Sequence, residues 1–250
     1  MPEEPDAARE LSAALGRTVS RRTARIELRH EFSFGLDEPP ARRTRPRGGL
    51  PVRELIGREL LGVALRTGGR LVERWVRKKI LQSATGFIDF ETQRCRFGDP
   101  SHATTTLVVG DRTWTGPFGT AVEAASADHA STLQPLWLVD LVRGVVTARE
   151  QPSEILQGRT CRRFSAHADL NRAAEAVRYQ LAIPTGTARL DELKRIPVEL
   201  WVDDEGRIRR IRHAHSSGAT PSVPPSTTTT VDLIEFDIEL PADWSSLPSV

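Results

Sequence analysis

Two histidines near the C-terminal end have the spacing of some metal sites. His213 and His215 alternate along an expected strand, so both imidazoles lie on one face of it. No third ligand can be named from the sequence, although a metal site needs one. The alternative is a pair of polar residues at a strand end that runs into a loop. We expect no metal site and no cofactor.

The acidic run Asp203-Asp204-Glu205-Gly206 superficially resembles a calcium loop. It lacks carboxylates at alternate positions and has no distal glutamate, both of which such a loop needs. Apolar residues alternate up to Asp203, and a second strand pattern follows from Arg207 to His215. The run therefore predicts a hairpin turn in which Gly206 supplies an unusual backbone dihedral.

The remaining ionisable side chains form no recognisable catalytic set. His30 lies among the apolar positions of an expected strand, which favours a hydrogen-bonded, half-buried histidine; a ligand or titrating role is the alternative. No nucleotide-binding glycine motif, nucleophile elbow or zinc-spaced cysteine set occurs. The carboxylates that cannot be paired as acid and base from their spacing are Asp89, Glu91, Asp99 and Asp111. We therefore expect a protein that is not an enzyme.

The strongest local charge lies between Arg42 and Lys79, with twelve basic and three acidic residues. A solvated helix face, an anionic membrane surface and nucleic acid could each use such charge. Nucleic acid is not expected, because no DNA- or RNA-binding motif accompanies the charge. Peripheral contact with an anionic membrane stays open, and the candidate contacts are Arg66, Arg70, Arg74, Arg77, Lys78 and Lys79.

Composition and the N-terminal residues limit the classes of protein to which the chain can belong. The chain has 250 residues, of which 38% are hydrophobic, and its mean hydropathy is −0.36, as in a globular protein. It shows no signal peptide, no lipid-modified cysteine motif and no apolar run long enough to span a bilayer. We expect a cytoplasmic protein in which Cys95 and Cys161 are free thiols.

Hydrophobic periodicity gives the elements that must position these residues. Expected strands are 18–34, 86–97, 104–116, 159–168, 198–202, 207–215 and 227–240, and expected helices are 6–16, 52–81, 134–147 and 170–181. Residues 36–51 read as a mobile basic Pro/Arg loop and residues 216–226 as a Ser/Pro loop. About seven strands and several helices without βαβ alternation predict one α+β domain over residues 1–250. The strand 227–240 is expected to pair antiparallel with 207–215.

From about Thr18 to Leu240 the chain resembles the lipoprotein-carrier superfamily that includes LolA and the LppX/LprG lipoproteins, most closely in its second half. The similar segments are Gly158-Arg159-Thr160-Cys161-Arg162-Arg163-Phe164 before Asp169-Leu170, the hairpin 197–211, and the early strands around 86–90 and 109–114. The resemblance implies a long, strongly curved antiparallel sheet, a half-barrel, with helices packed on its concave face over an apolar cavity. Relatives use that cavity for acyl chains of lipids or lipoproteins.

These observations favour a non-catalytic protein that binds a hydrophobic ligand, such as a lipid or acyl chain, between sheet and helices. The same apolar residues could instead fill a solid core. The alternative function is then a cytoplasmic protein-interaction or regulatory module on the same fold, without ligand. The expected cavity-lining residues are Ile26, Leu28, Phe32, Phe34, Phe90, Trp137, Leu141, Ile234 and Phe236.

Overall fold

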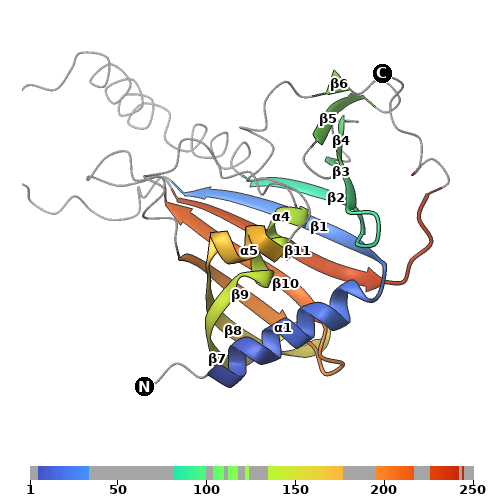
Figure 1. Ribbon diagram of the computed structural model, residues 1–250. Coiled ribbons are helices and arrows are strands. Elements are labelled where there is room, and N and C mark those ends of the chain that lie inside the picture. Colours follow the sequence, from blue (N-terminus) through green and yellow to red (C-terminus); the bar gives the residue numbers. More distant parts are fainter. Residues whose placement is uncertain are drawn as a thin grey trace, which may run out of the picture.

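One antiparallel sheet runs through the described part of the chain, and helices lie on one of its faces (Figure 1). The structure is a computed structural model. It describes residues 5–33, 81–99, 104–109, 112–117, 122–123, 135–176, 195–216, 226–241 and 244.

The order of strands in the sheet is β6-β5-β4-β3-β2-β1-β11-β10-β9-β8-β7. Every neighbouring pair is antiparallel, so two meanders, β1 to β6 and β7 to β11, join where β1 pairs with β11. The strands are β1 (Thr23–Ser33), β2 (Leu81–Asp89), β3 (Arg94–Asp99), β4 (Thr104–Val109), β5 (Arg112–Pro117), β6 (Val122–Glu123), β7 (Val145–Leu156), β8 (Arg159–Ala168), β9 (Ile196–Val202), β10 (Ile208–Ser216) and β11 (Ser226–Phe236).

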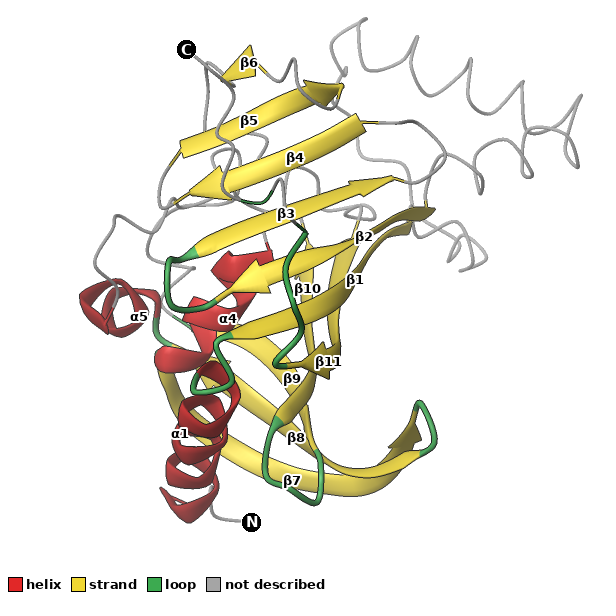
Figure 2. Ribbon diagram, turned by 90° about the vertical axis from the view of Figure 1, so that its right-hand side faces the viewer, coloured by secondary structure: helices red, strands yellow, loops and turns green. Residues whose placement is uncertain are grey.

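The helices of the described residues lie in the hollow of the curved sheet (Figure 2). They are α1 (Pro5–Val19), α4 (Pro135–Arg143) and α5 (Leu170–Ala176). Helix α1 contacts β7, β10 and α4, and α4 also contacts α5, β3, β8 and β10. None of these helices is long and apolar enough to cross a bilayer. The expected α+β fold class, a strongly curved antiparallel sheet with helices on its concave face, is confirmed.

Strand β1 has the two-faced pattern that its sequence predicts. Ala24, Ile26 and Leu28 are buried on the concave side, whereas Arg25 and Glu27 point to the opposite, outer face and are exposed. The strand is shorter than expected because the chain is still helical at Val19 and turns at residues 20–21.

Helix α1 continues through Gly16, where the sequence predicts its end. Thr18 lies in the last turn, and its Oγ1 donates to the carbonyl oxygen of Ala14 at 2.8 Å. The same hydroxyl accepts a hydrogen bond from the backbone N–H of Ile208 in β10 at 2.8 Å. The C-terminal turn of the helix is therefore tied to the sheet by a residue that the sequence pattern assigned to a strand.

Four short strands replace the two that were expected between residues 86 and 116. A turn at residues 90–93 separates β2 from β3, and β4 and β5 form a second hairpin. Asp89 organises the first turn, since its Oδ1 accepts from the backbone N–H groups of Glu91 and Thr92, both at 3.0 Å. The spacing of apolar residues did not indicate where these strands break.

Helix α4 is shorter than the expected 134–147 and is followed at once by β7, a strand the sequence did not predict. Eight consecutive residues of α4 are buried, from Pro135 to Val142, because the helix lies between the sheet and the other two helices. The pairing of β7 with β8 is interrupted by a bulge between Gln151 and Glu154, next to Pro152.

Strand β11 pairs antiparallel with β10, which confirms the expected contact of these segments. It ends at Phe236, earlier than the expected Leu240. A bulge opposite Arg25 and Ile26 of β1 leaves Ile234 unpaired, so the concave face carries Val231, Leu233 and then Phe236. Of the two expected lining residues of this strand, Ile234 and Phe236, only Phe236 packs against the core cluster.

Several expectations lie outside the described residues. The expected helix 52–81 does so except for Leu81, which begins β2, and so do the Pro/Arg loop 36–51 and residues 177–181 of the last expected helix. The Ser/Pro loop is narrower than residues 216–226, because Ser216 closes β10 and Ser226 opens β11.

Two glycines of the sheet and helix give a matched test of packing. A Cβ at Gly86 would lie 2.1 Å from the carbonyl oxygen of Arg96 and 2.6 Å from the Cα of Phe97, which are backbone atoms of β3. A Cβ at Gly16 would meet nothing within 4 Å. We expect Gly86→Ala to lower the free energy of unfolding by about 1–3 kcal/mol. We expect Gly16→Ala to raise it by about 0.5–1 kcal/mol, because alanine favours the helix. Urea unfolding followed by tryptophan fluorescence measures both, and equal effects would contradict the packing described here.

Candidate functional site

Five of the expected cavity-lining residues lie together in the core on the concave side. Ile26 and Leu28 of β1, Phe90 of the β2–β3 turn, and Trp137 and Leu141 of α4 are all at most 5% exposed and belong to one cluster of buried side chains. These five residues therefore share one apolar interior. Whether they enclose a ligand stays a prediction.

The other four expected lining residues have different outcomes. Phe236 is partly buried and packs against the core cluster, whereas Ile234 is the partly buried bulge residue of β11. Phe32 lies in β1, but its side chain is outside the described part of the structure, and Phe34 is wholly outside it. The six basic candidates for membrane contact, Arg66, Arg70, Arg74, Arg77, Lys78 and Lys79, also lie outside the described residues.

A row of polar side chains crosses three neighbouring strands on the concave face. Thr229 of β11 is in register with His30 of β1 on one side and with His213 of β10 on the other. Nδ1 of His30 lies 3.0 Å from Oγ1 of Thr229. His213 donates from Nδ1 to the carbonyl oxygen of Pro197 in β9 at 2.9 Å. Ile26 and Leu28 make the neighbouring part of this face apolar, and the row of His30, Thr229 and His213 adds polar atoms beside it.

Helix α4 places Trp137 against one end of this row. The indole ring lies 5.7 Å from the imidazole of His213, with 59° between the ring planes. Trp137 is 4% exposed and His30 is 3% exposed, yet Nε1 of Trp137 and Nε2 of His30 have no hydrogen-bond partner among the described residues. A buried polar group without a partner costs about 1–3 kcal/mol of stability, so two such atoms near one row require an explanation.

Burial keeps His30 uncharged. Desolvation by burial lowers the pKa of the His30 imidazole from 6.5 to about 4. At neutral pH its two ring nitrogens are therefore one donor and one acceptor. Thr229 occupies Nδ1, which leaves Nε2 for a neutral partner.

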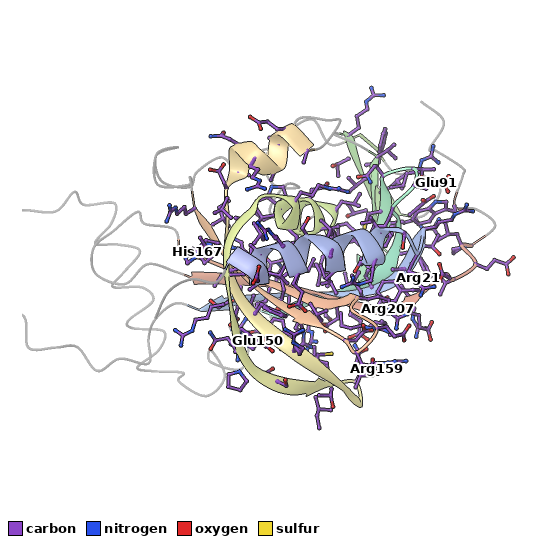
Figure 3. The ribbon with its side chains drawn as sticks, turned by 60° about the horizontal axis from the view of Figure 1, so that its bottom comes forward. Arg21, Glu91, Glu150, Arg159, His167 and Arg207 are labelled. Atoms are coloured by element: carbon purple, nitrogen blue, oxygen red, sulfur yellow. The ribbon has the colours of Figure 1, made fainter. Side chains whose placement is uncertain are left out.

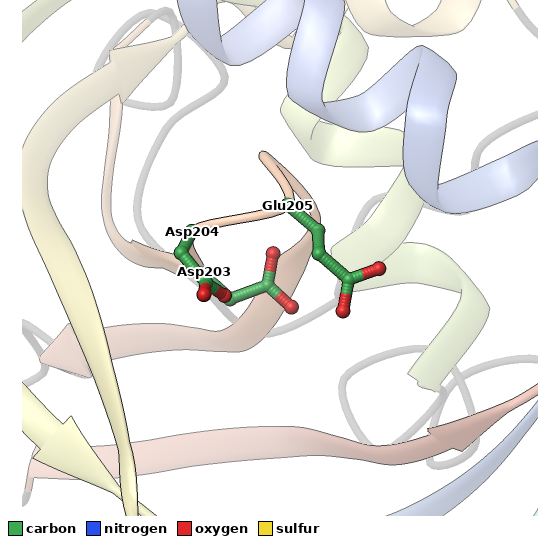
Figure 4. Close-up of side chains that lie close together, drawn as sticks. All are labelled: Asp203, Asp204 and Glu205. Atoms are coloured by element: carbon green, nitrogen blue, oxygen red, sulfur yellow. The ribbon is translucent and has the colours of Figure 1, made fainter.

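The acidic run at the β9–β10 turn pairs with arginines and holds the turn in place. Asp203, Asp204 and Glu205 lie close enough together for three of their ligand atoms to be within 4.8 Å (Figure 4). Asp203 is buried and accepts from Nη2 of Arg207 at 3.0 Å and from Nε of Arg209 at 2.7 Å. Its charge is thus matched by two guanidinium groups, and the prediction of a hairpin turn with Gly206 at positive φ, 72°, is confirmed.

Glu205 at the tip of this turn pairs with arginines from three parts of the chain. Arg21, Arg159 and Arg207 all reach its carboxylate and are labelled in Figure 3. The ion pairs with Arg21 and Arg159 have N–O separations of 4.0 and 3.8 Å and lie in solvent, where such pairs contribute little. This cluster joins the turn to the neighbouring α1–β1 and β7–β8 connections.

The two histidines with metal-site spacing have different surroundings. His213 donates a hydrogen bond to Pro197 and lies against Trp137 with the two rings tilted, whereas the side chain of His215 is outside the described part of the structure. Sequence reasoning did not identify Thr229, because a threonine in a run of four threonines carries no signal of its own. Its importance arises from the register of β11 between β1 and β10.

No protein-family model matches the chain, and no curated protein sequence matches it. Solved structures do resemble it. Lipoprotein LppX of Mycobacterium tuberculosis matches with a TM-score of 0.47 and 11% identity, over 96% of this chain and 100% of that one. LprF of Mycobacterium bovis has a TM-score of 0.47 and 12% identity over 100% of both chains. A LolA superfamily protein of Nitrosomonas europaea has a TM-score of 0.37 and 6% identity, over 96% of this chain and 97% of that one.

The lowered pKa of His30 predicts a specific loss of stability in mild acid. The imidazole titrates at 6.5 in the unfolded chain and at about 4 in the folded one. Between these values the unfolded chain binds more protons, so the free energy of unfolding falls as the pH falls from 6.5 towards 4. The full effect is roughly 3 kcal/mol. We expect His30→Asn, which keeps a polar atom near Thr229, to be less stable at pH 7 but to lose about 2–3 kcal/mol less than wild type between pH 7 and 4.5. Parallel curves of urea unfolding against pH would exclude this role of His30.

Proposed function

We propose that this chain is a non-catalytic binding protein that holds a hydrophobic ligand, such as a lipid or acyl chain, between the sheet and helices α1 and α4. The observation that carries the proposal is the pair of buried nitrogen atoms without partners, Nε1 of Trp137 and Nε2 of His30. A solid core would gain stability by replacing such groups with apolar ones of the same shape. In a core that opens to accept a ligand, these two nitrogen atoms form hydrogen bonds with that ligand.

The apolar part of the proposed site is supported by the side chains around these atoms. Ile26 and Leu28 precede His30 on the concave face of β1, and Leu141 lies one helical turn after Trp137 in α4. A ligand between α4 and the sheet would therefore contact aliphatic groups along most of its length. Binding sites for small molecules commonly combine such a lining with a few fixed polar groups.

The polar atoms indicate which kind of hydrophobic ligand fits. Nε1 of an indole can only donate a hydrogen bond, so it requires an acceptor on the ligand. His30 is neutral at pH 7 and supplies no positive charge for a carboxylate. An uncharged ligand with a carbonyl oxygen, such as an acyl ester, matches these groups better than a pure hydrocarbon or a charged fatty acid.

The same row of residues argues against an enzyme. Thr229 and His30 are within hydrogen-bonding distance, as a nucleophile and its base would be. A working pair needs a third group that orients the imidazole, but Nε2 of His30 has no partner among the described residues. A histidine with a pKa of about 4 is also a weak base.

Native mass spectrometry tests whether a ligand is present. We expect protein purified without detergent to carry an adduct that is removed by organic extraction and identified as an apolar, ester- or amide-containing compound. A protein that always shows the mass of its sequence alone, and that binds no apolar probe, would contradict the proposal. It would favour the alternative, an interaction or regulatory module with a filled core.

Replacement of the Trp137 indole tests whether it donates a hydrogen bond to a carbonyl group of the ligand. The probe pair is methyl palmitate and octadecane, which have equal chain length but differ in the ester group, measured by displacement of 1-aminoanthracene. We expect Trp137→Phe to weaken binding of methyl palmitate about tenfold, the loss of one buried hydrogen bond, with octadecane unchanged. The matched control is Trp114→Phe, since Trp114 is buried to a similar degree but lies on β5. Equal losses for both ligands would show that Trp137 acts by packing alone.

A further inference from the structure

The outer face of the sheet, opposite to the helices, has a pocket of its own. It measures about 250 Å³ and lies over strands β1, β11, β10, β9, β8 and β7. The lining residues are Arg29, Glu31, Glu154, Arg163, Trp201, Arg210, Arg212 and Thr230. None of these side chains belongs to the proposed hydrophobic site, so the two sites are independent.

The pocket forms where the short side chain of Thr230 lies among the long side chains of arginines. Thr230 of β11 is in register with Arg29 of β1 and with Arg212 of β10, so it lies directly between two arginines. Arg210 points to the same face one repeat away, beside Asp232. The threonine hydroxyl therefore sits at the floor, with guanidinium groups on three sides.

Two carboxylates of this face, Asp232 and Glu199, are already engaged by arginines. Asp232 is 1% exposed and accepts hydrogen bonds from both Arg29 and Arg210. Glu199 likewise accepts from both Arg163 and Arg212. These pairs hold the four guanidinium groups in place, and each carboxylate is shared between two of them.

Trp201 and Glu154 close the remaining side of the pocket. The indole lies between the guanidinium groups of Arg163 and Arg210, whose Cζ atoms are 5.3 and 5.5 Å from its ring centre. Its Nε1 donates to Oε2 of Glu154 at 2.9 Å, and Arg163 donates to Oε1 of the same carboxylate at 2.7 Å. Four arginines are thus bonded to three carboxylates, and Glu31 on the rim is a fourth, so the charges balance, while the guanidinium groups have more N–H donors than these bonds use.

We propose that this pocket binds a small oxoanion, a phosphate or carboxylate group, either free or as the end of a larger molecule. Such a group supplies only acceptors, which is what a cluster of guanidinium groups and a hydroxyl lacks. The planar forks of arginine match the geometry of both phosphate and carboxylate. Glu31 on the rim opposes the ligand's charge, so removing its charge tightens binding.

The test compares two variants of one face with equal loss of charge, Arg212→Gln and Arg25→Gln, together with one that removes the hydroxyl group. Arg212→Gln removes a pocket arginine while Glu199 keeps its bond to Arg163, and Thr230→Val removes the hydroxyl with its shape retained. Arg25→Gln is the control, because Arg25 lies on the same face of β1 outside the pocket and pairs with Glu235. Calorimetric titration at constant ionic strength uses inorganic phosphate, glycerol 1-phosphate and acetate as probes.

We expect wild type to bind phosphate, Arg212→Gln to weaken it about tenfold, and Arg25→Gln to change it less than about twofold. Thr230→Val is expected to weaken binding severalfold, and Glu31→Gln to strengthen it. Tighter binding of glycerol 1-phosphate than of inorganic phosphate would identify a phosphate ester as the ligand, and preference for acetate a carboxylate. The proposal is overturned if no probe binds wild type, or if Arg25→Gln and Arg212→Gln weaken binding equally. Neither outcome depends on whether the chain binds a hydrophobic ligand on its other face.

Discussion

The buried carboxylate of Asp203 is the interaction on which the arrangement of the half-barrel depends. Desolvation acts to raise the pKa of Asp203, but the hydrogen bonds from Arg207 and Arg209 outweigh it and the pKa is lowered, so the group stays charged in the fold. Arg209 is itself the bulge residue of β10, and it donates to the carbonyl oxygen of Ile234, the bulge residue of β11, at 3.0 Å. On the other side of the turn, Arg17 of α1 donates to the carbonyl oxygen of Gly206 at 2.9 Å. The Asp203 carboxylate thus holds the hairpin and, through Arg209, the two bulges, while the backbone of the same turn binds the last turns of α1.

The fold was predictable where a local pattern alone decides the structure. The alternation in β1 and the turn at Gly206 give a strand and a hairpin whatever surrounds them. The break after α4 depends on distant contacts instead. Apolar spacing continues past Gly144, but a Cβ there would lie 2.2 Å from the carbonyl oxygen of Asp169, so α5 packs directly on the glycine. The following strand, β7, is polar along most of its length, so apolar periodicity does not mark it, although it forms a hairpin with the next strand, β8.

The candidate site was predictable only in its apolar half. Residues such as Ile26 and Leu141 are buried because their spacing places them on a face that has to be covered. The row of His30, Thr229 and His213 depends on the register of strands from the two ends of the chain, and a shift by one residue would move Thr229 to the outer face. The pocket around Thr230 has the same origin. It requires a small side chain on β11 to lie between arginines of two other strands, and the sequence of one strand does not show which residues lie beside it.

The described sheet is not closed into a barrel, so each of its two outermost strands has a free edge. Such an edge can pair with the edge of another copy of the chain. An exposed strand edge is a template for pairing with another molecule and for growth of intermolecular sheets. Strand β6 spans only two residues, which is too short to act as such a template. Strand β7 spans twelve residues, but Pro152 removes a backbone donor within it, the bulge at Gln151–Glu154 distorts the edge, and Arg149 and Glu150 place charge along it. The half-barrel therefore keeps an open architecture while offering little to an aggregating neighbour.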